Sequence, residues 1–362
     1  MKIGFFGSSL VSSYWNGAAT YYRGLLKEMA ALGHEITFYE PDAYERQQHR
    51  DIPDPEWARV VVYPATEDGW QMSVDRAGRE SDLLVKASGV GVFDTELECA
   101  MPDAARSGAL TIFWDVDAPA TLDSIDQSTT HHLRGMIPRY DLVLTYGGGD
   151  PVVSAYRKLG ARRCEPIYNA LDPNTHYPVP ARADLACDLN LLANRLPDRE
   201  ARVDEFFLSV AASLPDRRFL LGGSGWHTKE LPRNVRLAGH VGTQDHNAFF
   251  CSAAVVLNVN RESMARYGFS PPTRIFEAAG AGACIISDTW AGIEHFLEPE
   301  KEILVADDGA AVADALANLD SLTRQRLANG ARARVLAHHT YARRAQEVNE
   351  LLGVDAKREV AA

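Results

Sequence analysis

Residues 268–288 read GFSPPTRIFEAAGAGACIISD and join a predicted helix to a predicted strand. Ser270 is a favourable N-cap and Pro271 is tolerated at the first helical position, so we expect the helix to begin there. The alanines and glycines that follow have little bulk, which favours close packing of the helix. The apolar run from Cys284 to Ile286 is typical of a buried strand. A helix followed directly by such a strand is one unit of a parallel α/β sheet.

The same alternation of short apolar runs and helix-length segments extends from this stretch toward both ends of the chain. It is typical of βαβ units and parallel sheets. In the first half we predict strands near residues 2–7, 35–40, 59–63, 82–87, 109–114, 141–145 and 163–167. In the second half we predict strands near 187–193, 217–222, 234–237, 254–258, 283–287 and 302–305. Helices are predicted at 17–32, 201–213, 245–252, 271–281 and 308–318, with two more in the tail at 320–352.

A Pro-rich stretch from Asp172 to Pro180 interrupts the alternation and favours a linker. We therefore predict an α/β protein of two Rossmann-like domains, whose parallel sheets face each other across a ligand cleft. The predicted boundaries are 1–172 for the N-terminal domain, 173–185 for the linker, 186–337 for the C-terminal domain, and 338–362 for a helix and tail that return toward the N-terminal domain.

Composition narrows the class of protein. The 362 residues are 46% hydrophobic and 24% charged, the balance of a folded chain, and the net charge is −12. A general nucleic-acid binder needs a basic surface, so we expect no nucleic-acid partner. The five cysteines form no CxxC pair, and we expect them to be reduced. No apolar run approaches the roughly 18 residues of a membrane span or suits a signal peptide, so we predict a cytoplasmic protein, leaving room for peripheral membrane contact.

Two charged residues of the opening stretch indicate a ligand site. A cation in the first turn opposes the helix dipole, so Arg274 is poorly placed for helix stability alone, but with the free amides of that turn it suits a phosphate. Glu277 lies one turn further on the same face and could accept both hydroxyls of a ribose. The alternative is a solvated Arg274–Glu277 ion pair contributing about 0.2–0.5 kcal/mol. The segment rich in glycine and alanine at 278–283 and the strand that follows it favour the ligand site.

Residues 268–283 resemble the nucleotide-binding motif of the retaining GT-B glycosyltransferases. They are most similar to the branch related to the spore-maturation protein CgeB, which carries an Arg-x-x-Glu version of the motif. Four further segments look like this branch: NRLPDRE at 194–200, GGSGW at 222–226, WDVDAP at 114–119 and YGGGD at 146–150. The resemblance spans nearly the whole chain and implies the GT-B fold. One position departs from it, because many retaining relatives have a second glutamate where this chain has Phe269.

The resemblance also implies roles for individual residues of the C-terminal, nucleotide-sugar-binding domain. Arg195 and Arg199 would hold the donor diphosphate, although a surface pairing with Asp198 and Glu200 is the alternative. Glu277 would bind the ribose. The remaining predicted donor-binding residues are Gly239, His240 and Val241 for the base, Asn260 and Arg261 at a strand end, and Ser270, Thr273 and Arg274 at the helix start.

The N-terminal domain is expected on the acceptor side. Its predicted acceptor or donor-phosphate residues are Gly7, Ser8, Ser9, Asn16, Gly17, Lys86, Ser88 and Gly148. Asp115 and Asp117 end a predicted strand and would share a face if the strand continued. We interpret them as an acceptor-side pair and, for an inverting reaction, as candidate catalytic bases; a strand-end Asp that caps the next turn is the alternative. The loop after the first strand lacks GxGxxG, which disfavours an NAD enzyme.

Together these features predict a glycosyltransferase that moves a sugar from a UDP, TDP or GDP donor to a hydroxyl of a small-molecule or lipid-linked acceptor. Arg274 is the candidate catalytic residue that stabilises the leaving diphosphate. We expect no cofactor and no metal site, and a retaining reaction. Two alternatives stay open at this point: a nucleotide-sugar epimerase on the same fold, and a two-lobed ligand-binding protein.

Overall fold

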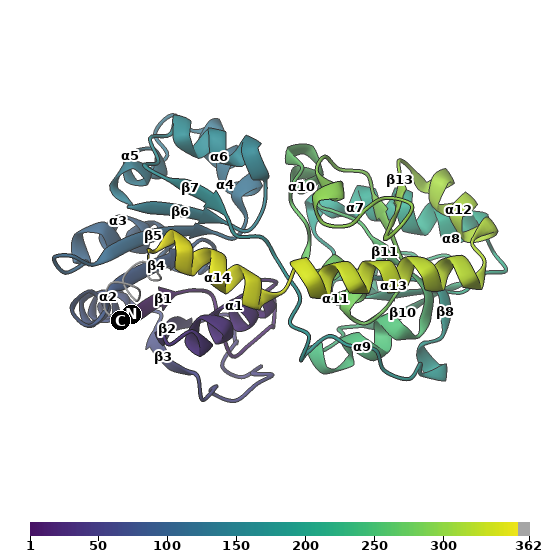
Figure 1. The fold of residues 1–362 in the computed structure, drawn as a ribbon, viewed down its shortest axis with the longest axis horizontal. Helices are drawn as coiled ribbons and strands as arrows, with labels where there is room; N and C mark the ends of the chain where they lie inside the picture. The colour runs from purple at the N-terminus through teal and green to yellow at the C-terminus, as the bar shows by residue number, and fades with distance from the viewer. Residues whose placement is uncertain (354–362) are drawn as a thin grey trace. The chain divides into compact units, whose positions relative to one another are not determined.

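The structure of the protein is a computed structural model that describes residues 1–353. The chain forms two compact α/β units (Figure 1). The first contains residues 1–168 and the segment that starts at Tyr341, and the second contains residues 169–340. The segment predicted as a linker, 173–185, therefore belongs to the second unit. The predicted C-terminal segment 338–362 contributes Tyr341 onward to the first unit, and its residues 354–362 lie outside the described part of the chain.

The first unit is built on a seven-stranded parallel sheet with the order β3-β2-β1-β4-β5-β6-β7. Its strands are β1 (Lys2–Phe6), β2 (Glu35–Asp42), β3 (Ala58–Pro64), β4 (Leu83–Ala87), β5 (Leu110–Asp115), β6 (Leu142–Thr145) and β7 (Cys164–Pro166). Its helices are α1 (Ala19–Ala31), α2 (Glu67–Glu80), α3 (Asp94–Ala104), α4 (Ala118–Gln127), α5 (Leu133–Met136), α6 (Gly149–Lys158) and α14 (Tyr341–Leu351).

The second unit is built on a six-stranded parallel sheet with the order β10-β9-β8-β11-β12-β13. Its strands are β8 (Cys187–Leu192), β9 (Phe219–Gly222), β10 (Val235–Gly239), β11 (Ala253–Asn258), β12 (Ile285–Asp288) and β13 (Leu304–Ala306). Its helices are α7 (Pro197–Val203), α8 (Ser209–Ser213), α9 (Thr243–Cys251), α10 (Glu262–Tyr267), α11 (Thr273–Gly280), α12 (Gly309–Asn318) and α13 (Ser321–His338). Each strand predicted from the sequence is present, which confirms the two-sheet architecture.

The order of the strands reverses once in each sheet, between β1 and β4 and between β8 and β11. At such a switch point the two flanking connections run in opposite directions, which opens a crevice beyond the carboxyl ends of the strands. Ligands of open α/β sheets bind in that crevice. The switch points therefore mark where a site is to be sought in each unit.

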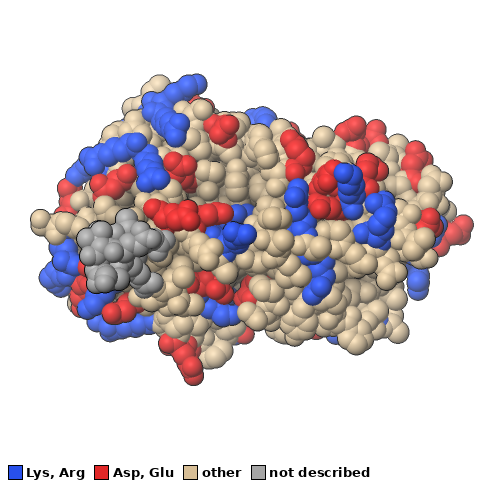
Figure 2. Space-filling model, in the orientation of Figure 1, with Lys and Arg blue, Asp and Glu red and all other residues tan. Residues whose placement is uncertain are grey.

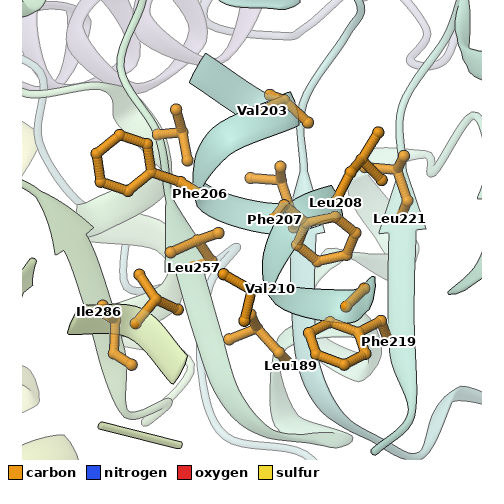
Figure 3. Packing of buried hydrophobic residues seen from close by; sticks show 14 of the residues in the cluster. Leu189, Val203, Phe206, Phe207, Leu208, Val210, Phe219, Leu221, Leu257 and Ile286 are labelled. Atoms are coloured by element: carbon orange, nitrogen blue, oxygen red, sulfur yellow. The ribbon is translucent and has the colours of Figure 1, made fainter. Parts of the chain in front are cut away.

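The core of the second unit lies between its sheet and the helical segment formed by α7, a π-helical turn at Asp204–Leu208, and α8. Figure 3 shows Phe206 and Phe207 pointing from this segment onto the sheet. The ring of Phe207 meets that of Phe219 edge to face, with centroids 5.6 Å apart. Burying each such side chain contributes about 1.5–3 kcal/mol, so this packing fixes the strands whose ends carry polar residues.

Helix α14 packs against α1 in the first unit, although the two are far apart in the sequence (Figure 1). Gly24 of α1 makes the close approach feasible, because a Cβ atom there would lie 2.1 Å from the ring of Tyr341. The Nε2 atom of His34 also lies 2.7 Å from the amide oxygen of Asn349. The C-terminal helix is thus an integral part of the N-terminal unit.

The two units carry charges of both signs. Figure 2 shows acidic and basic side chains intermingled on the visible face of each unit. Among the described residues, no helix is both long and apolar enough to cross a membrane.

Replacing Gly24 with alanine should destabilise the first unit. The added methyl group would overlap the Tyr341 ring, and such overpacking costs about 1–3 kcal/mol. Thermal unfolding followed by circular dichroism should show the loss. Gly135→Ala is the matched control, because a Cβ atom there meets nothing within 4 Å. Equal melting temperatures for the two variants would show that α14 does not pack on α1 in this way.

Candidate active site

Helix α11 begins later than the sequence predicted. The prediction of Ser270 as N-cap is wrong, because the helix spans Thr273–Gly280 and its N-cap is Pro272. The cause is the Pro271–Pro272 pair, since a residue that precedes proline is disfavoured in the helical region. The hydroxyl of Ser270, which is 1% exposed, instead donates to the carbonyl of Gly268 at 2.9 Å. The segment 270–272 is therefore an extended lead-in to the helix.

Arg274 occupies the first turn of α11 and is buried. Its Nε atom donates to the carbonyl of Leu192 at 2.5 Å, and its Nη1 atom donates to the side-chain oxygen of Asn258 at 2.6 Å. Leu192 ends β8 and Asn258 ends β11, so the guanidinium group lies at the switch point of the second sheet. Both acceptors are neutral, and the charge of Arg274 is therefore not balanced by the groups that hold it.

A second cation adds to this positive region. Arg199 of α7 is also buried, and its Nη1 atom donates to the carbonyl of Asn194 at 3.3 Å. Burial, and then the nearby charge of Arg199, lower the pKa of Arg274 from 12.5 to about 9, although Glu277 and Asp288 act in the opposite direction. Two buried guanidinium groups that repel each other would both be stabilised by an anion placed between them and solvent.

Glu277 lies one turn beyond Arg274 and is 6% exposed. Within residues 1–353 no donor is recorded at hydrogen-bonding distance from its carboxylate; the nearest ring nitrogens are His176 Nε2 at 3.8 Å and His246 Nδ1 at 3.9 Å. Burial raises its pKa, while His246 and Arg274 lower it. The alternative of a solvated Arg274–Glu277 pair is wrong, because both side chains are buried and Arg274 is held by Leu192 and Asn258.

Two histidines that were not predicted as site residues lie beside Glu277. His176 comes from the Pro-rich segment and is 1% exposed, and His246 comes from the first turn of α9. His246 also interacts with the backbone of Val241, which places the predicted base-binding loop of Gly239, His240 and Val241 close to Glu277. No spacing in the sequence relates His176 to Glu277. For His246 the one signal in the sequence is its place in the helix that directly follows the predicted base-binding loop at 239–241.

The other predicted donor residues of the second unit are engaged with protein groups. Arg195 makes a two-pronged ion pair with Glu200, both contacts at 2.8 Å, and with Lys229 it lowers the pKa of Glu200 to about 2. Arg261 pairs with Asp198 at 2.8 Å.

Asn260 is fully buried; its amide nitrogen donates to the carbonyl of Ser270 at 3.5 Å and its backbone N–H to Asp288 at 3.0 Å. It therefore positions the lead-in to α11. Thr273 is the first residue of that helix and is half-buried.

Phe269, at the position of the expected second glutamate, adopts a left-handed backbone with φ 47°. Its backbone N–H donates to the carbonyl of Ala291 at 2.6 Å. Its ring lies 5.3 Å from that of His295, and a Cβ atom on Gly292 would meet it at 2.3 Å. An aromatic ring therefore occupies the position of the second glutamate of the family that the sequence resembles.

In the first unit, the loop after β1 is tied together internally. The hydroxyl of Ser8 donates to the side-chain oxygen of Asn16 at 2.8 Å, and the Asn16 amide donates to the carbonyl of Ser9 at 2.8 Å. Glu40, fully buried near the end of β2, accepts from the backbone N–H of Leu10 at 2.6 Å.

The predicted glycines lie at the two ends of this loop: Gly7 at its start and Gly17 just before α1. The loop is a preorganised platform at the switch point between β1 and β4.

Asp115 is surrounded by hydrogen-bond donors of the first unit. It is fully buried at the end of β5 and accepts hydrogen bonds from the hydroxyls of Ser88 (2.7 Å), Thr121 (3.0 Å) and Tyr156, and from the backbone N–H of Asp117 (3.0 Å). Burial raises its pKa against the effect of these donors. Because β5 ends at Asp115, Asp117 does not continue the strand but precedes α4 as its N-cap residue. The two carboxylates thus have different surroundings.

Lys86 and Gly148 also have roles within the fold. Lys86 is fully buried, and its ammonium group binds Asp94 at 2.7 Å and Glu98 at 3.3 Å. Gly148 has φ 92° before α6, where a Cβ atom would lie 1.9 Å from Val152. A larger residue at 148 would therefore disturb the start of α6.

Removing the Asp115 carboxylate should destabilise the first unit by at least about 3 kcal/mol, because Asp115→Ala leaves two buried hydroxyls, of Ser88 and Tyr156, and two part-buried donors without this acceptor. Urea unfolding measures the loss, with the exposed Asp126→Ala as the control. A variant as stable as the wild type would show that these hydrogen bonds do not stabilise the first unit in this way.

The chain is similar to known proteins in part of its sequence and in its fold. Residues 199–350 match a protein family described as glycosyl transferase-like. No curated protein matches the chain in sequence. Sucrose-phosphate synthase from Thermosynechococcus elongatus has a similar structure, with a TM-score of 0.74 and 15% identity over 100% of both chains.

Two further solved structures are similar. HepE from Anabaena, solved in complex with UDP and glucose, gives a TM-score of 0.68 and 15% identity, covering 98% of this chain and 100% of HepE. An alpha-glucosyltransferase, solved with UDP and a 13-mer DNA containing an HMU base, gives 0.71 and 11%, covering 97% and 98%. The protein therefore has the GT-B fold of these glycosyltransferases, and residues 199–350 are similar to a glycosyl transferase-like family.

Proposed function

We propose that the protein transfers a sugar from a nucleoside diphosphate donor to a hydroxyl group of an acceptor. One observation carries this proposal: within residues 1–353, buried Arg274 at the switch point of the second sheet is held by neutral oxygens alone, and one turn further the Glu277 carboxylate meets no hydrogen-bond donor. The first group suits a diphosphate and the second suits the two hydroxyls of a ribose.

The same pair of groups defines the donor as a nucleoside diphosphate but does not select its base. Neither Arg274 nor Glu277 reads a base, so UDP, TDP and GDP sugars all fit the proposal. HepE and the alpha-glucosyltransferase were each solved with UDP, and HepE also with UDP-glucose, which makes UDP the first candidate. The base would lie against the backbone of the Gly239, His240 and Val241 loop, which adjoins Glu277 through His246.

The proposed chemistry is a displacement at the anomeric carbon of the donor sugar. The bond from this carbon to the diphosphate oxygen breaks as the bond to the acceptor oxygen forms. The electron pair goes to the diphosphate, where Arg274, Arg199 and the amides of the first turn of α11 stabilise the growing charge. Because these cationic groups are fixed in advance, we propose a reaction that needs neither metal nor cofactor.

The acceptor proton has two candidate destinations. In the retaining reaction that we propose, the leaving diphosphate accepts it and no side-chain base is needed. If the reaction inverts, half-buried Asp117 is the better base, since Asp115 is saturated by four donors. The predicted residues of the β1 loop, from Gly7 to Gly17, would then face the acceptor or the donor phosphate.

The class of acceptor and the cellular location that we propose are based on composition. With a net charge of −12 we propose a small-molecule or lipid-linked acceptor and not a nucleic acid, which would need a basic surface. The five cysteines are free, which fits the reducing cytoplasm that we propose as the location.

A thermal-shift panel with UDP, TDP, GDP and CDP tests the donor proposal. The preferred nucleotide at 100 times its dissociation constant should add about 2.7 kcal/mol of stability. In Arg274→Gln the preference for that diphosphate over its nucleoside should fall at least tenfold, because the charged contact is lost. Arg233→Ala, an exposed arginine in the same unit, should keep the preference. A preference that survives Arg274→Gln unchanged would remove Arg274 from the diphosphate site.

A further inference from the structure

Three potential ligand atoms converge in the second unit: His176 Nε2, His246 Nδ1 and a carboxylate oxygen of Glu277, all within 4.8 Å of one another. The two nitrogens lie 3.3 Å apart, and different oxygens of Glu277 approach them: Oε1 lies 3.8 Å from His176 Nε2, and Oε2 lies 3.9 Å from His246 Nδ1. Zinc binds nitrogen and oxygen at about 2.0–2.2 Å in tetrahedral geometry, which separates its ligand atoms by about 3.3–3.6 Å. A rotation of the Glu277 carboxylate, with small shifts of the two rings, would therefore bring one of its oxygens and both nitrogens onto one ion.

These atoms have too few protons to satisfy one another. The hydroxyl of Thr175 donates to the carbonyl of Asp172 at 3.1 Å, so its oxygen accepts from His176 Nδ1 at 2.9 Å. In the neutral ring, His176 Nε2 then carries a lone pair. His246 Nδ1 can supply at most one proton, and the Glu277 carboxylate, beyond hydrogen-bonding distance of both rings, has no donor among residues 1–353. An arrangement of three acceptors and at most one proton suits a cation.

The position of the His176 ring is also fixed by its neighbours. Asn247 fixes the His176 backbone from both sides: its side-chain oxygen accepts from the Tyr177 N–H at 3.1 Å and its amide donates to the Thr175 carbonyl at 2.9 Å. The Thr175 contact orients the ring in the way that outer-shell partners orient metal-bound histidines.

We propose that His176, His246 and Glu277 form a binding site for a divalent transition-metal ion, with Zn²⁺ as the best fit. Two imidazoles and one carboxylate are a ligand set that zinc uses when its fourth position stays open, whereas Mg²⁺ and Ca²⁺ prefer oxygen ligands alone. His246 is partly exposed, with 15% of its side chain accessible, which gives the ion a route to the site.

Zinc at this site would also interfere with donor binding. This second part of the inference rests on the proposed function, in which Glu277 binds the ribose. A Glu277 carboxylate bound to Zn²⁺ is drawn toward the histidines and is no longer available to both hydroxyls of a ribose. Zinc and the nucleoside therefore compete, and by linkage each weakens the other by the same factor. The metal acts here as an inhibitor of donor binding and has no part in sugar transfer.

Metal binding is tested first, with Zn²⁺ titrated against a chromophoric chelator and Co²⁺ as the spectroscopic substitute. The wild type should bind one ion that His176→Ala and His246→Ala each weaken more than about 100-fold, since loss of an outer-shell partner alone costs 10–100-fold. His227→Ala, an exposed histidine of the same unit, should bind as the wild type does. Equal affinity in all variants, or a Co²⁺ spectrum with a thiolate charge-transfer band, would overturn the site.

Competition is tested with uridine, because a diphosphate would itself chelate Zn²⁺. Saturating Zn²⁺ should weaken uridine binding at least tenfold in the wild type, and this sensitivity should vanish in His246→Ala whatever its own uridine affinity. If zinc binds but leaves uridine affinity unchanged, the metal site stands and the ribose role of Glu277 fails. If uridine binding depends on Glu277 and zinc does not bind, the metal proposal alone fails.

Discussion

The contact between Arg274 and the ends of two strands organises the second unit. The guanidinium group joins the last residue of β8, Leu192, to the last residue of β11, Asn258, across the point where strand order reverses. Burying a charge is unfavourable unless polar groups compensate, and neutral oxygens compensate it only in part. The protein therefore keeps an incompletely compensated positive group at the end of its sheet. The orientation of α11, and with it the position of Glu277, depends on this contact.

The first unit treats its buried charges differently. Lys86 is matched by Asp94 and Glu98, and Asp115 is surrounded by four donors. Such satisfied groups stabilise a fold and have little capacity left for a ligand. Arg274 and Glu277 lack full compensation within the described residues, and this is the physical distinction between a structural polar group and a binding group in this protein. The same distinction applied to His176 and His246 leads to the metal site.

The strands and most helices could be predicted because apolar runs and turns are local features of the sequence. The start of α11 could not, since Ser270 has the chemistry of an N-cap and only the Pro271–Pro272 pair moves the helix to Thr273. Arg274 and Glu277 were recognisable because they share one short helix. Burial was not readable in the same way: Asp115 and Lys86 looked like cleft residues and lie inside the fold. His176 joins Glu277 through tertiary packing alone.

The central claim is that the Glu277 carboxylate accepts hydrogen bonds from the ribose hydroxyls. A double-mutant cycle between protein and ligand tests it most directly. Calorimetry with chelator present would measure UDP and 2′-deoxy-UDP binding to the wild type and to Glu277→Gln. A hydrogen bond to a charged group is worth about 1.5–3 kcal/mol, so the wild type should prefer UDP by at least tenfold. In Glu277→Gln most of that preference should disappear. The same preference for UDP in both proteins would contradict the account.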